Sequence, residues 1–444
     1  MAAESDLLIV GAGAKAAGIA AKVHAFNSLG LGPISLTIVE GTEVAASWKG
    51  RNGMTSGEEP LAVTPIKDVG FPYQSFREFG EAGEAIDDQV MRFSWQRYMV
   101  SRRRYARWID AGSPSVRHRD YGEYLTWVLA RAGEGVNHVA GRVTRVSLED
   151  GERWAVDVSE ADGSSRHTAS ALVLTGPGIH RAFPHEPSVA GRVFHCDSRR
   201  EEFAQLPEEQ GCDVAIVGGG ESALSCVMFL RSFRPQSRFT IYTPMLPMSR
   251  GESFLENRVF SNPDEVEWTA LDQTTRRDFV KHSDRGVFDP PSLAAIAYDD
   301  RCRFVTGRVT DVAAVRDSDR VRLQHESPEG IASPEHDYVV NCTGFDLLTQ
   351  LRTLFPAETR GEIEGRVGQL WDTVTGTEVP IGRHLELRGM RPRLQIPGLA
   401  GLSQGPGFAN LGALGLLANR VLQPLLDERA SMPATDHVSI NLNT

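Results

Sequence analysis

The sequence predicts an α/β fold with two Rossmann-like dinucleotide-binding domains, the second inserted in the first. Two observations predict it. A strand, a glycine turn and a helix start occur at residues 6–16 and again at 213–223, and apolar strands ending in Thr-Gly flank the second pattern. The 444 residues suffice for two or three domains. We predict that the first domain is formed by residues 1–190 and 336–425, that residues 191–335 form the inserted domain, and that residues 426–444 form a polar tail.

The first glycine turn follows an apolar strand. Gly11 permits the tight turn, Gly13 lets backbone amides approach a pyrophosphate, and Ala16 replaces the third glycine where helix and strand pack closely. The N–H groups and dipole of the helix N-terminus favour the negative charge of phosphates. The next strand ends in Glu40, the acid expected to bind a ribose hydroxyl. Glycines between a strand and a helix can also form only a turn.

The second glycine turn contains Gly218, Gly220 and Ser222, which we expect to contact phosphate. The strand after it ends in Thr243 and not in an acid, and a carboxylate there would repel a 2′-phosphate. This pattern predicts NADPH rather than NADH, with the phosphate bound by one of three arginines in the region: Arg234, Arg238 or Arg250. Two dinucleotide motifs in one chain suggest an enzyme that passes hydride from a nicotinamide to a flavin, here FAD.

Composition argues against several other classes. The net charge of −11 disfavours nucleic acid as the main partner, and no apolar run is long enough to cross a membrane. The N-terminus does not read as a signal peptide, so the cytoplasm is expected. The five cysteines show neither a C-x-x-C pair nor metal-like spacing with histidine, which disfavours disulfide reductases and predicts no metal site. The run Arg102–Arg104 is interpreted first as a solvated helix face and second as a contact for cofactor phosphate.

The rest of the sequence indicates a long loop, further helices and a third glycine-rich turn. Residues 41–72, rich in glycine and proline, are expected to form a long functional loop. Helices are expected within 90–109 and 121–131, the second capped by Asp120. The run 401–412 is a glycine-rich turn before an apolar helix. It suits negative charge on a reduced flavin, and it is equally compatible with a buried closing helix.

Together these features resemble the flavin-dependent N-hydroxylating monooxygenases, most closely the lysine N6-hydroxylases of mycobactin- and nocobactin-type siderophore pathways. The resemblance covers nearly the full length. Besides the glycine turns and the Thr-Gly strand ends, it rests on Trp48, Pro65–Tyr73 (PIKDVGFPY), His195, Phe254–Phe260 (FLENRVF) and Gln404–Leu411 (QGPGFANL).

The resemblance implies N6-hydroxylation of free L-lysine with FAD, NADPH and O₂, through a C4a-hydroperoxyflavin. It implies that Lys67 and Asn257 hold the carboxylate and amine of the amino acid. Asp284, where ornithine enzymes usually have asparagine, and Asn410 are also assigned to the substrate, and FAD is assigned Trp48, Gln404 and Leu411. Residue type alone favours a surface position for Lys67, because lysine is rarely buried unless it is paired. Its place in the long loop and the resemblance favour the anchoring role.

Three alternatives stay open. They are L-ornithine N5-hydroxylation, a flavin monooxygenase acting on sulfur or ketone substrates, and an NADPH oxidase that releases only peroxide. Two departures from the family pattern bear on how well flavin oxidation is coupled to hydroxylation. Ala62 replaces a glutamine often found near the flavin, and Arg258 stands where many relatives have glutamate. The subunit count also stays open, with a homo-oligomer among the options.

Overall fold

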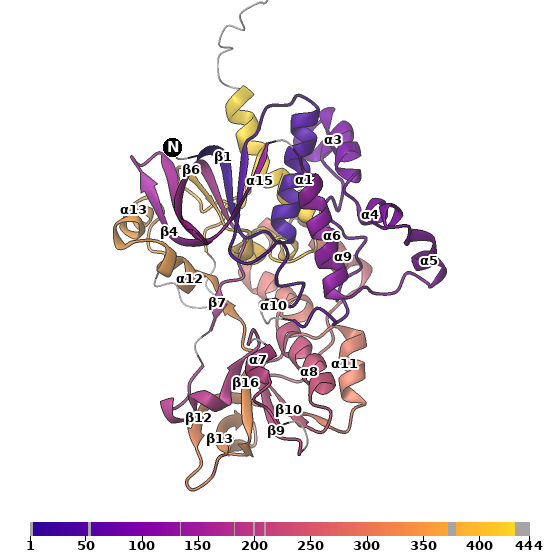
Figure 1. The fold of residues 1–444 in the computed structure, drawn as a ribbon, viewed down its shortest axis with the longest axis vertical. Coiled ribbons are helices and arrows are strands. Elements are labelled where there is room, and N and C mark those ends of the chain that lie inside the picture. Colours follow the sequence, from indigo (N-terminus) through magenta and orange to yellow (C-terminus); the bar gives the residue numbers. More distant parts are fainter. Residues whose placement is uncertain are drawn as a thin grey trace, which may run out of the picture.

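The structure is a computed structural model that describes residues 3–51, 55–133, 135–181, 183–198, 200–207, 210–371 and 379–430. Its elements form two lobes, each built around a sheet flanked by helices, and a short link joins the lobes (Figure 1). The chain forms the first lobe, enters the second and returns to the first. The predicted α/β fold, with one Rossmann-like domain inserted in another, is therefore confirmed.

The first sheet has the strand order β3-β2-β1-β6-β5-β4, with β18 beside β6. Its strands are β1 (Ala3–Val10), β2 (Leu36–Glu40), β3 (Val136–Ala140), β4 (Arg142–Glu149), β5 (Arg153–Glu160), β6 (Gly163–Leu174) and β18 (Arg393–Gln395). Strands β1, β2 and β3 pair in parallel, and β6 joins β1 in parallel after an antiparallel meander. Leu7, Leu8 and Ile9 are fully buried, as expected for a central parallel strand covered on both faces.

Helix α1 (Ala14–Ser28) packs closely against α15 (Leu414–Ala430) and against the loop after β2. A Cβ added at Gly18 would lie 3.2 Å from the Val69 carbonyl oxygen and 3.4 Å from that of Leu414. The other helices of this lobe are α2 (Phe76–Phe79), α3 (Ala82–Met91), α4 (Trp95–Ser101), α5 (Tyr105–Asp110), α6 (His118–Arg131), α12 (Leu347–Leu354), α13 (Ala357–Val367), α14 (Gly401–Gln404) and the 3₁₀ turns η4 (Pro397–Leu399) and η5 (Pro406–Phe408).

The second sheet is entirely parallel, in the order β11-β10-β9-β16-β8. Its strands are β8 (Val193–His195), β9 (Asp213–Val217), β10 (Arg238–Thr243), β11 (Cys302–Thr306) and β16 (Tyr338–Asn341). The smaller elements around it are η1 (Pro187–Arg192), α7 (Arg200–Phe203), α8 (Glu221–Phe233), β12 (Arg308–Ala314), β13 (Val321–Ser327), β14 (Gly330–Ala332) and β15 (Glu335–His336). The two chain crossings between the lobes, β7 (Ile179–His180) and β17 (Phe345–Asp346), pair with each other.

The connection from β10 to β11 is long and helical. It contains α9 (Phe254–Ser261), η2 (Pro263–Val266), η3 (Trp268–Ala270), α10 (Gln273–Ser283) and α11 (Pro290–Ala297). Helix α9 packs on η5, and α10 packs on α14, both of which belong to the first lobe. This connection therefore bridges the two lobes.

Several local predictions were wrong. Strand β16 pairs with β9 and β8, so it belongs to the second sheet, although the sequence suggested a return to the first domain at residue 336. The same Thr-Gly ending occurs in both sheets, which explains the error. The single helical stretch expected at 90–109 is divided among α3, α4 and α5. Helix α6 starts two residues before Asp120, which lies in its first turn and not at the cap. The other domain boundaries stay predictions.

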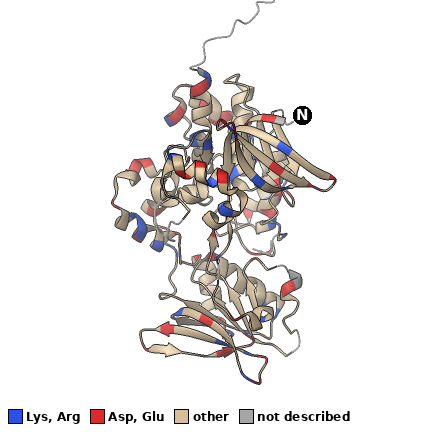
Figure 2. Cartoon of the chain, turned by 90° about the vertical axis from the view of Figure 1, so that its left-hand side faces the viewer, with Lys and Arg blue, Asp and Glu red and all other residues tan. Residues whose placement is uncertain are grey.

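Charges of both signs are interspersed over the two lobes (Figure 2). Arg102, Arg103 and Arg104 are exposed between α4 and α5, which favours the interpretation as a solvated surface. Within the described ranges, no helix combines the length and the apolar character needed to span a membrane.

Candidate active site between the two sheets

The first glycine turn has the shape that a dinucleotide needs. Gly11 has a φ of +98°, and a Cβ there would lie 2.6 Å from the Thr175 hydroxyl. Beside Gly13 no atom lies within 4 Å of an added Cβ, so the backbone faces open space. The Glu40 carboxylate lies at the end of β2 and accepts hydrogen bonds from the backbone N–H of Ala12 and Thr42, both at 2.9 Å. Ala16 is fully buried. This turn fits a nucleotide diphosphate with an acid near the ribose.

The second glycine turn lies between the end of β9 and α8. Gly218 has a φ of +154°, and a Cβ there would clash with the Cys342 carbonyl oxygen. Gly220 is the N-cap of α8, and the partly buried Ser222 is its second residue. A Cβ on Gly220 would lie 3.6 Å from the backbone nitrogen of Gly286. The segment after α10, which carries Asp284, therefore lies against this turn.

Only one of the three arginines considered for the 2′-phosphate lies at this turn. Arg234 is buried and donates to the carbonyl oxygens of Ala204 and Leu206, at 3.2 and 2.8 Å. Arg238 begins β10 and so lies at the opposite end of that strand from the glycine turn. Two of the three candidates therefore lie away from the glycine turn, because nearness in sequence does not show at which end of a strand a side chain lies.

Arg250 is the arginine that the fold brings to the second glycine turn. Its guanidinium lies 3.3 Å from the carboxylate of Glu221, the first residue of α8. It also donates to Glu252 at 3.0 Å and to the Ala62 carbonyl oxygen at 2.7 Å. Arg250 thus connects the second glycine turn to the long loop of the first lobe. Thr243 is buried, and its hydroxyl donates to the Met245 carbonyl oxygen at 2.5 Å.

Lys67 and Asn257 meet although they are 190 residues apart. The Lys67 ammonium donates to the Asn257 side-chain oxygen at 2.7 Å. The Asn257 amide nitrogen donates to the carbonyl oxygens of Glu252 and Ser253 at 2.9 and 3.2 Å, which orients its oxygen toward Lys67. Burial and the nearby Arg250 lower the pKa of Lys67 from its ordinary value. The pair is a partly buried positive site between the loop of the first lobe and α9.

Asp284 and Asn410 form a second long-range pair. The Asn410 amide nitrogen donates to the Asp284 carboxylate at 2.9 Å, and its oxygen accepts from the backbone N–H of Gly412 at 2.8 Å. The Arg285 guanidinium lies 3.1 Å from the other Asp284 oxygen. The end of α10 and residues 401–412, which form the closing segment of the first lobe, therefore meet at one carboxylate.

Sequence reasoning missed Lys15, the only charged residue among residues 11–16 of the first glycine turn. Its ammonium donates to the Ala409 carbonyl oxygen at 3.0 Å and to that of Thr175 at 3.5 Å. Burial lowers the pKa of Lys15 to about 8, with a further lowering by Arg285 that Asp284 opposes. A lysine inside an otherwise small-residue motif was the signal that could have identified it.

The three residues assigned to FAD by resemblance lie in different settings. Trp48 packs edge-on against His118 and Tyr121, with ring centroids at 5.1 and 5.3 Å. Gln404 is buried; its amide nitrogen donates to the Ile381 carbonyl oxygen at 2.9 Å, and its oxygen accepts from Arg420 at 3.4 Å. Leu411 is partly buried beside Asn410. Arg258, one of the departures from the family pattern, is paired with Glu265.

Three cysteines lie together in the core of the second lobe, a grouping that their sequence spacing did not indicate. Cys342 lies with Cys196 and Cys226 in the buried hydrophobic core of this lobe. Burial raises the pKa of Cys342 well above its ordinary value. A buried, protonated thiol is a poor nucleophile, so this grouping lacks the reactivity that a disulfide reductase requires.

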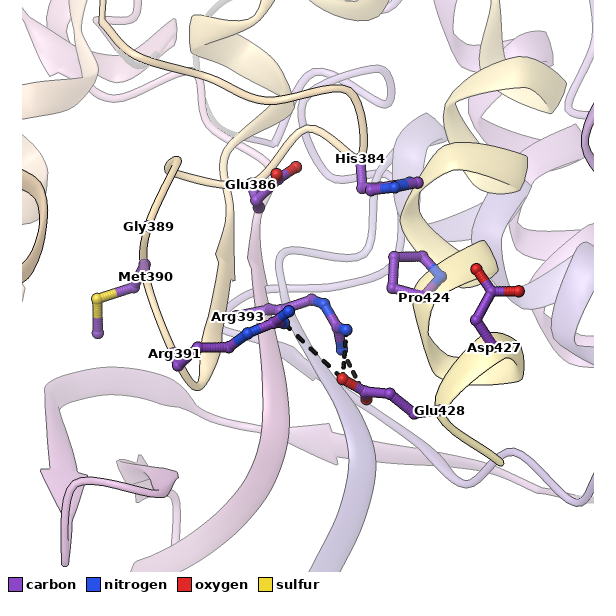
Figure 3. Close-up of a pocket in the computed structure, with 9 residues that line it drawn as sticks. All are labelled: His384, Glu386, Gly389, Met390, Arg391, Arg393, Pro424, Asp427 and Glu428. Carbon is purple, nitrogen blue, oxygen red and sulfur yellow. Dashed lines mark hydrogen bonds and ion pairs between the residues drawn. The ribbon is translucent and has the colours of Figure 1, made fainter. Parts of the chain in front are cut away.

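A separate pocket of about 450 Å³ opens between residues 384–393 and the end of α15 (Figure 3). There the Arg393 guanidinium pairs with the Glu428 carboxylate, one of the contacts being 2.8 Å. None of the site residues predicted from the sequence lines this pocket. The candidate site is therefore the region between the two glycine turns.

Comparison with known proteins identifies close relatives. Residues 86–347 match the family model described as L-lysine 6-monooxygenase/L-ornithine 5-monooxygenase. L-lysine N6-monooxygenase MbtG of Mycobacterium tuberculosis (strain H37Rv) is 36% identical over 424 residues, covering 94% of each chain. MbtG of Mycobacterium sp. (strain MCS) is also 36% identical, over 437 residues, covering 96% of this chain and 97% of the relative.

Two solved monooxygenase structures are also similar to this chain over nearly its full length. Lysine monooxygenase NbtG from Nocardia farcinica aligns with a TM-score of 0.78 at 32% identity, covering 94% of this chain and 98% of that one. The ornithine N-hydroxylase KtzI of Kutzneria sp. 744 aligns with a TM-score of 0.75 at 18% identity, covering 96% and 100% of the two chains. At that identity the second likeness concerns the fold alone.

Proposed function

The chain belongs to the L-lysine 6-monooxygenase/L-ornithine 5-monooxygenase family, and from this premise we propose that it hydroxylates the side-chain amine of free L-lysine. The reaction consumes NADPH and O₂, uses FAD, and yields N6-hydroxylysine for hydroxamate siderophore assembly. The names of the relatives at 36% identity support lysine as the substrate. The observation that carries the proposal is the Lys67–Asn257 contact between the loop of the first lobe and α9.

Lys67 anchors the carboxylate of the substrate. A free amino acid carries one fixed anion, and an ammonium is a compact point charge suited to it. The Asn257 oxygen accepts from Lys67 at 2.7 Å and is equally suited to accept from the α-ammonium of the substrate. Together the two side chains bind both charges of the amino-acid end and leave its side chain free to extend.

The Asp284–Asn410 pair receives the far end of the substrate. The reacting amine must be neutral, yet the ammonium of lysine has a reference pKa of about 10.4. Lys15 and Arg285 place positive charge near Asp284, which disfavours a further cation there. Asp284 accepts from Asn410 at 2.9 Å, which fixes the position of its carboxylate at the far end of the proposed substrate site.

We assign FAD to the first sheet and NADPH to the second. The turn at Gly11, Gly13 and Ala16 holds the FAD diphosphate and Glu40 holds a ribose hydroxyl, with further FAD contacts from Trp48, Gln404 and Leu411. The second turn holds NADPH through Gly218, Gly220, Ser222 and Arg250. When bound, FAD supplies the redox chemistry that links NADPH oxidation to the use of O₂. The chain contributes binding, orientation and exclusion of water.

One experiment separates this proposal from ornithine N5-hydroxylation and from an NADPH oxidase. NADPH consumed, peroxide released and hydroxylamine formed are measured with L-lysine, L-ornithine and no substrate. We expect hydroxylamine with lysine in amounts close to the NADPH consumed. Peroxide as the only product with every substrate would identify an oxidase, and a clear preference for ornithine would identify the N5-hydroxylase; either result overturns the proposal.

A further inference from the structure

The segment that carries Asn257 packs against the first lobe, although its chain position is between two strands of the second sheet. A Cβ added at Gly405 would lie 2.7 Å from the Pro263 side chain, and one added at Gly407 would clash with the Phe260 carbonyl oxygen. The Trp268 indole N–H donates to the Leu402 carbonyl oxygen at 3.0 Å. The residues 254–270 therefore lie directly on the closing segment of the first lobe.

A buried arginine holds this contact together. The Arg420 side chain on α15 is only 1% exposed. Its guanidinium donates to the Asp264 carboxylate at 2.6 Å and to the Gln404 side-chain oxygen at 3.4 Å, and it lies over the Phe408 ring at 4.5 Å. A cation at such depth is costly unless it is paired, so the position of Asp264 is strongly constrained.

Asp264 is shared with a second cation of the first lobe. Arg383 donates to the other Asp264 oxygen at 3.2 Å and to the Glu78 carboxylate at 3.1 Å. Burial raises the pKa of Asp264, but Arg420 and Arg383 lower it by more, so the pKa lies below its ordinary value. The carboxylate is therefore charged at neutral pH and bound on both sides by the first lobe.

Asp264 lies in η2, directly after α9, and Asn257 lies in the middle of α9. A helix of this length, about 12 Å, moves as a rigid rod, so a shift at its end displaces Asn257. Lys67 is on the loop of the first lobe, whereas Asn257 is on the connection from the second sheet. The 2.7 Å contact between them thus depends on how firmly η2 is held.

We propose that Arg420 is a positioning residue for substrate binding: through Asp264 it fixes α9 to the first lobe and so holds the Asn257 side chain against Lys67. This inference rests on the proposed function, because it takes Lys67 and Asn257 to be the amino-acid site. In this arrangement the FAD-binding domain holds Asn257 in position, although the connection that carries Asn257 links two strands of the NADPH-binding sheet.

The test compares Asp264→Asn, which keeps the shape of the side chain and removes its charge, with Arg420→Met and Arg420→Lys in the FAD-loaded enzyme. We expect Asp264→Asn and Arg420→Met to raise the KM for lysine about tenfold and to lower hydroxylamine per NADPH. In Asp264→Asn, flavin content and the KM for NADPH stay near wild type, because the partners of Asp264 are Arg420 and Arg383, which lie outside both glycine turns. Arg420→Lys restores part of the loss. Arg153→Met, which removes an exposed ion pair with Glu4 (2.9 Å) within the first sheet, is the matched control and leaves the KM for lysine unchanged.

A second arm distinguishes positioning from general destabilisation. In a Lys67→Ala background, Asp264→Asn should raise the KM for lysine little further, because the pair that it positions is already broken. The inference is overturned if Asp264→Asn raises the KM for lysine by the same factor with and without Lys67→Ala. It is also overturned if the KM for lysine of Asp264→Asn equals that of the wild type. Wild-type hydroxylamine formation is measured first. Its absence with lysine is a failure of the proposed function, whereas its presence with unaffected variants is a failure of this inference alone.

Discussion

Replacing Lys67 with alanine tests the substrate anchor directly. The Lys67 ammonium has three donors, and the 2.7 Å bond to Asn257 uses one of them. A hydrogen bond to a charged group contributes about 1.5–3 kcal/mol, and about 1.4 kcal/mol corresponds to a factor of ten. We therefore expect the KM for lysine to rise about 10- to 160-fold. Hydroxylation should be lost at ordinary lysine concentrations while peroxide release persists, because Lys67 lies outside both glycine turns.

The assay measures hydroxylamine, peroxide and NADPH consumption over a range of lysine concentrations, with flavin content as the folding check. Lys281→Ala is the control, because this exposed lysine on α10 pairs only at the surface with Asp278, at 3.6 Å. Lys67→Arg keeps the positive charge and should lose less affinity than the alanine variant. A Lys67→Ala enzyme with the wild-type KM for lysine and the wild-type hydroxylamine yield would show that the carboxylate binds elsewhere.

Three further predictions concern the cofactor turns and the partly buried Lys15. A Cβ at Gly13 meets only open space, so Gly13→Ala should leave the thermal stability of the FAD-free protein unchanged, and it should weaken FAD binding in a titration. A Cβ at Gly218 meets the Cys342 carbonyl oxygen, so Gly218→Ala should lower the melting temperature of the FAD-free protein. Equal melting temperatures of the two variants would contradict this prediction. Arg250→Met should raise the KM for NADPH more than the KM for NADH, and parallel increases would remove Arg250 from the 2′-phosphate. The pKa of Lys15 in the folded protein is about 8, below the unfolded value of 10.5, so the free energy of unfolding of the wild type should rise by about 3 kcal/mol between those pH values. Urea unfolding of FAD-free Lys15→Met should lack this rise. A parallel rise in both proteins would refute the lowered pKa of Lys15.

The sequence was sufficient for the fold because its signals are local. An apolar strand, a glycine that needs a positive φ and a small-residue helix follow each other directly in both motifs. The pairing of Lys67 with Asn257 was expected only through the resemblance, since no local pattern relates residues 190 apart. The sequence could not choose among Arg234, Arg238 and Arg250, because distance along a chain does not give the direction in which a strand runs.

The ion pair between Arg420 and Asp264 could not be predicted from the sequence for a related reason. Arg420 and Asp264 are 156 residues apart, and each alone is typical of a surface charge. What makes the pair distinctive is burial, which depends on how α15 packs against the connection between β10 and β11. The contact of Lys15 with the Ala409 carbonyl oxygen was likewise not predictable from sequence, because the two residues are 394 positions apart.

The place of α9 within the connection from β10 to β11 bears on how this enzyme can diversify. A recombination event that exchanged the second domain as one block would also replace Asn257, Asp264 and Asp284, because all three are encoded inside that block. The incoming helix would then have to match Lys67 and Arg420, which the recipient gene keeps. With the proposed site, nicotinamide preference and amino-acid preference are inherited together, and a chimera with a new reductant needs its crossovers placed on either side of 254–284 as well as at the two interlobe strands.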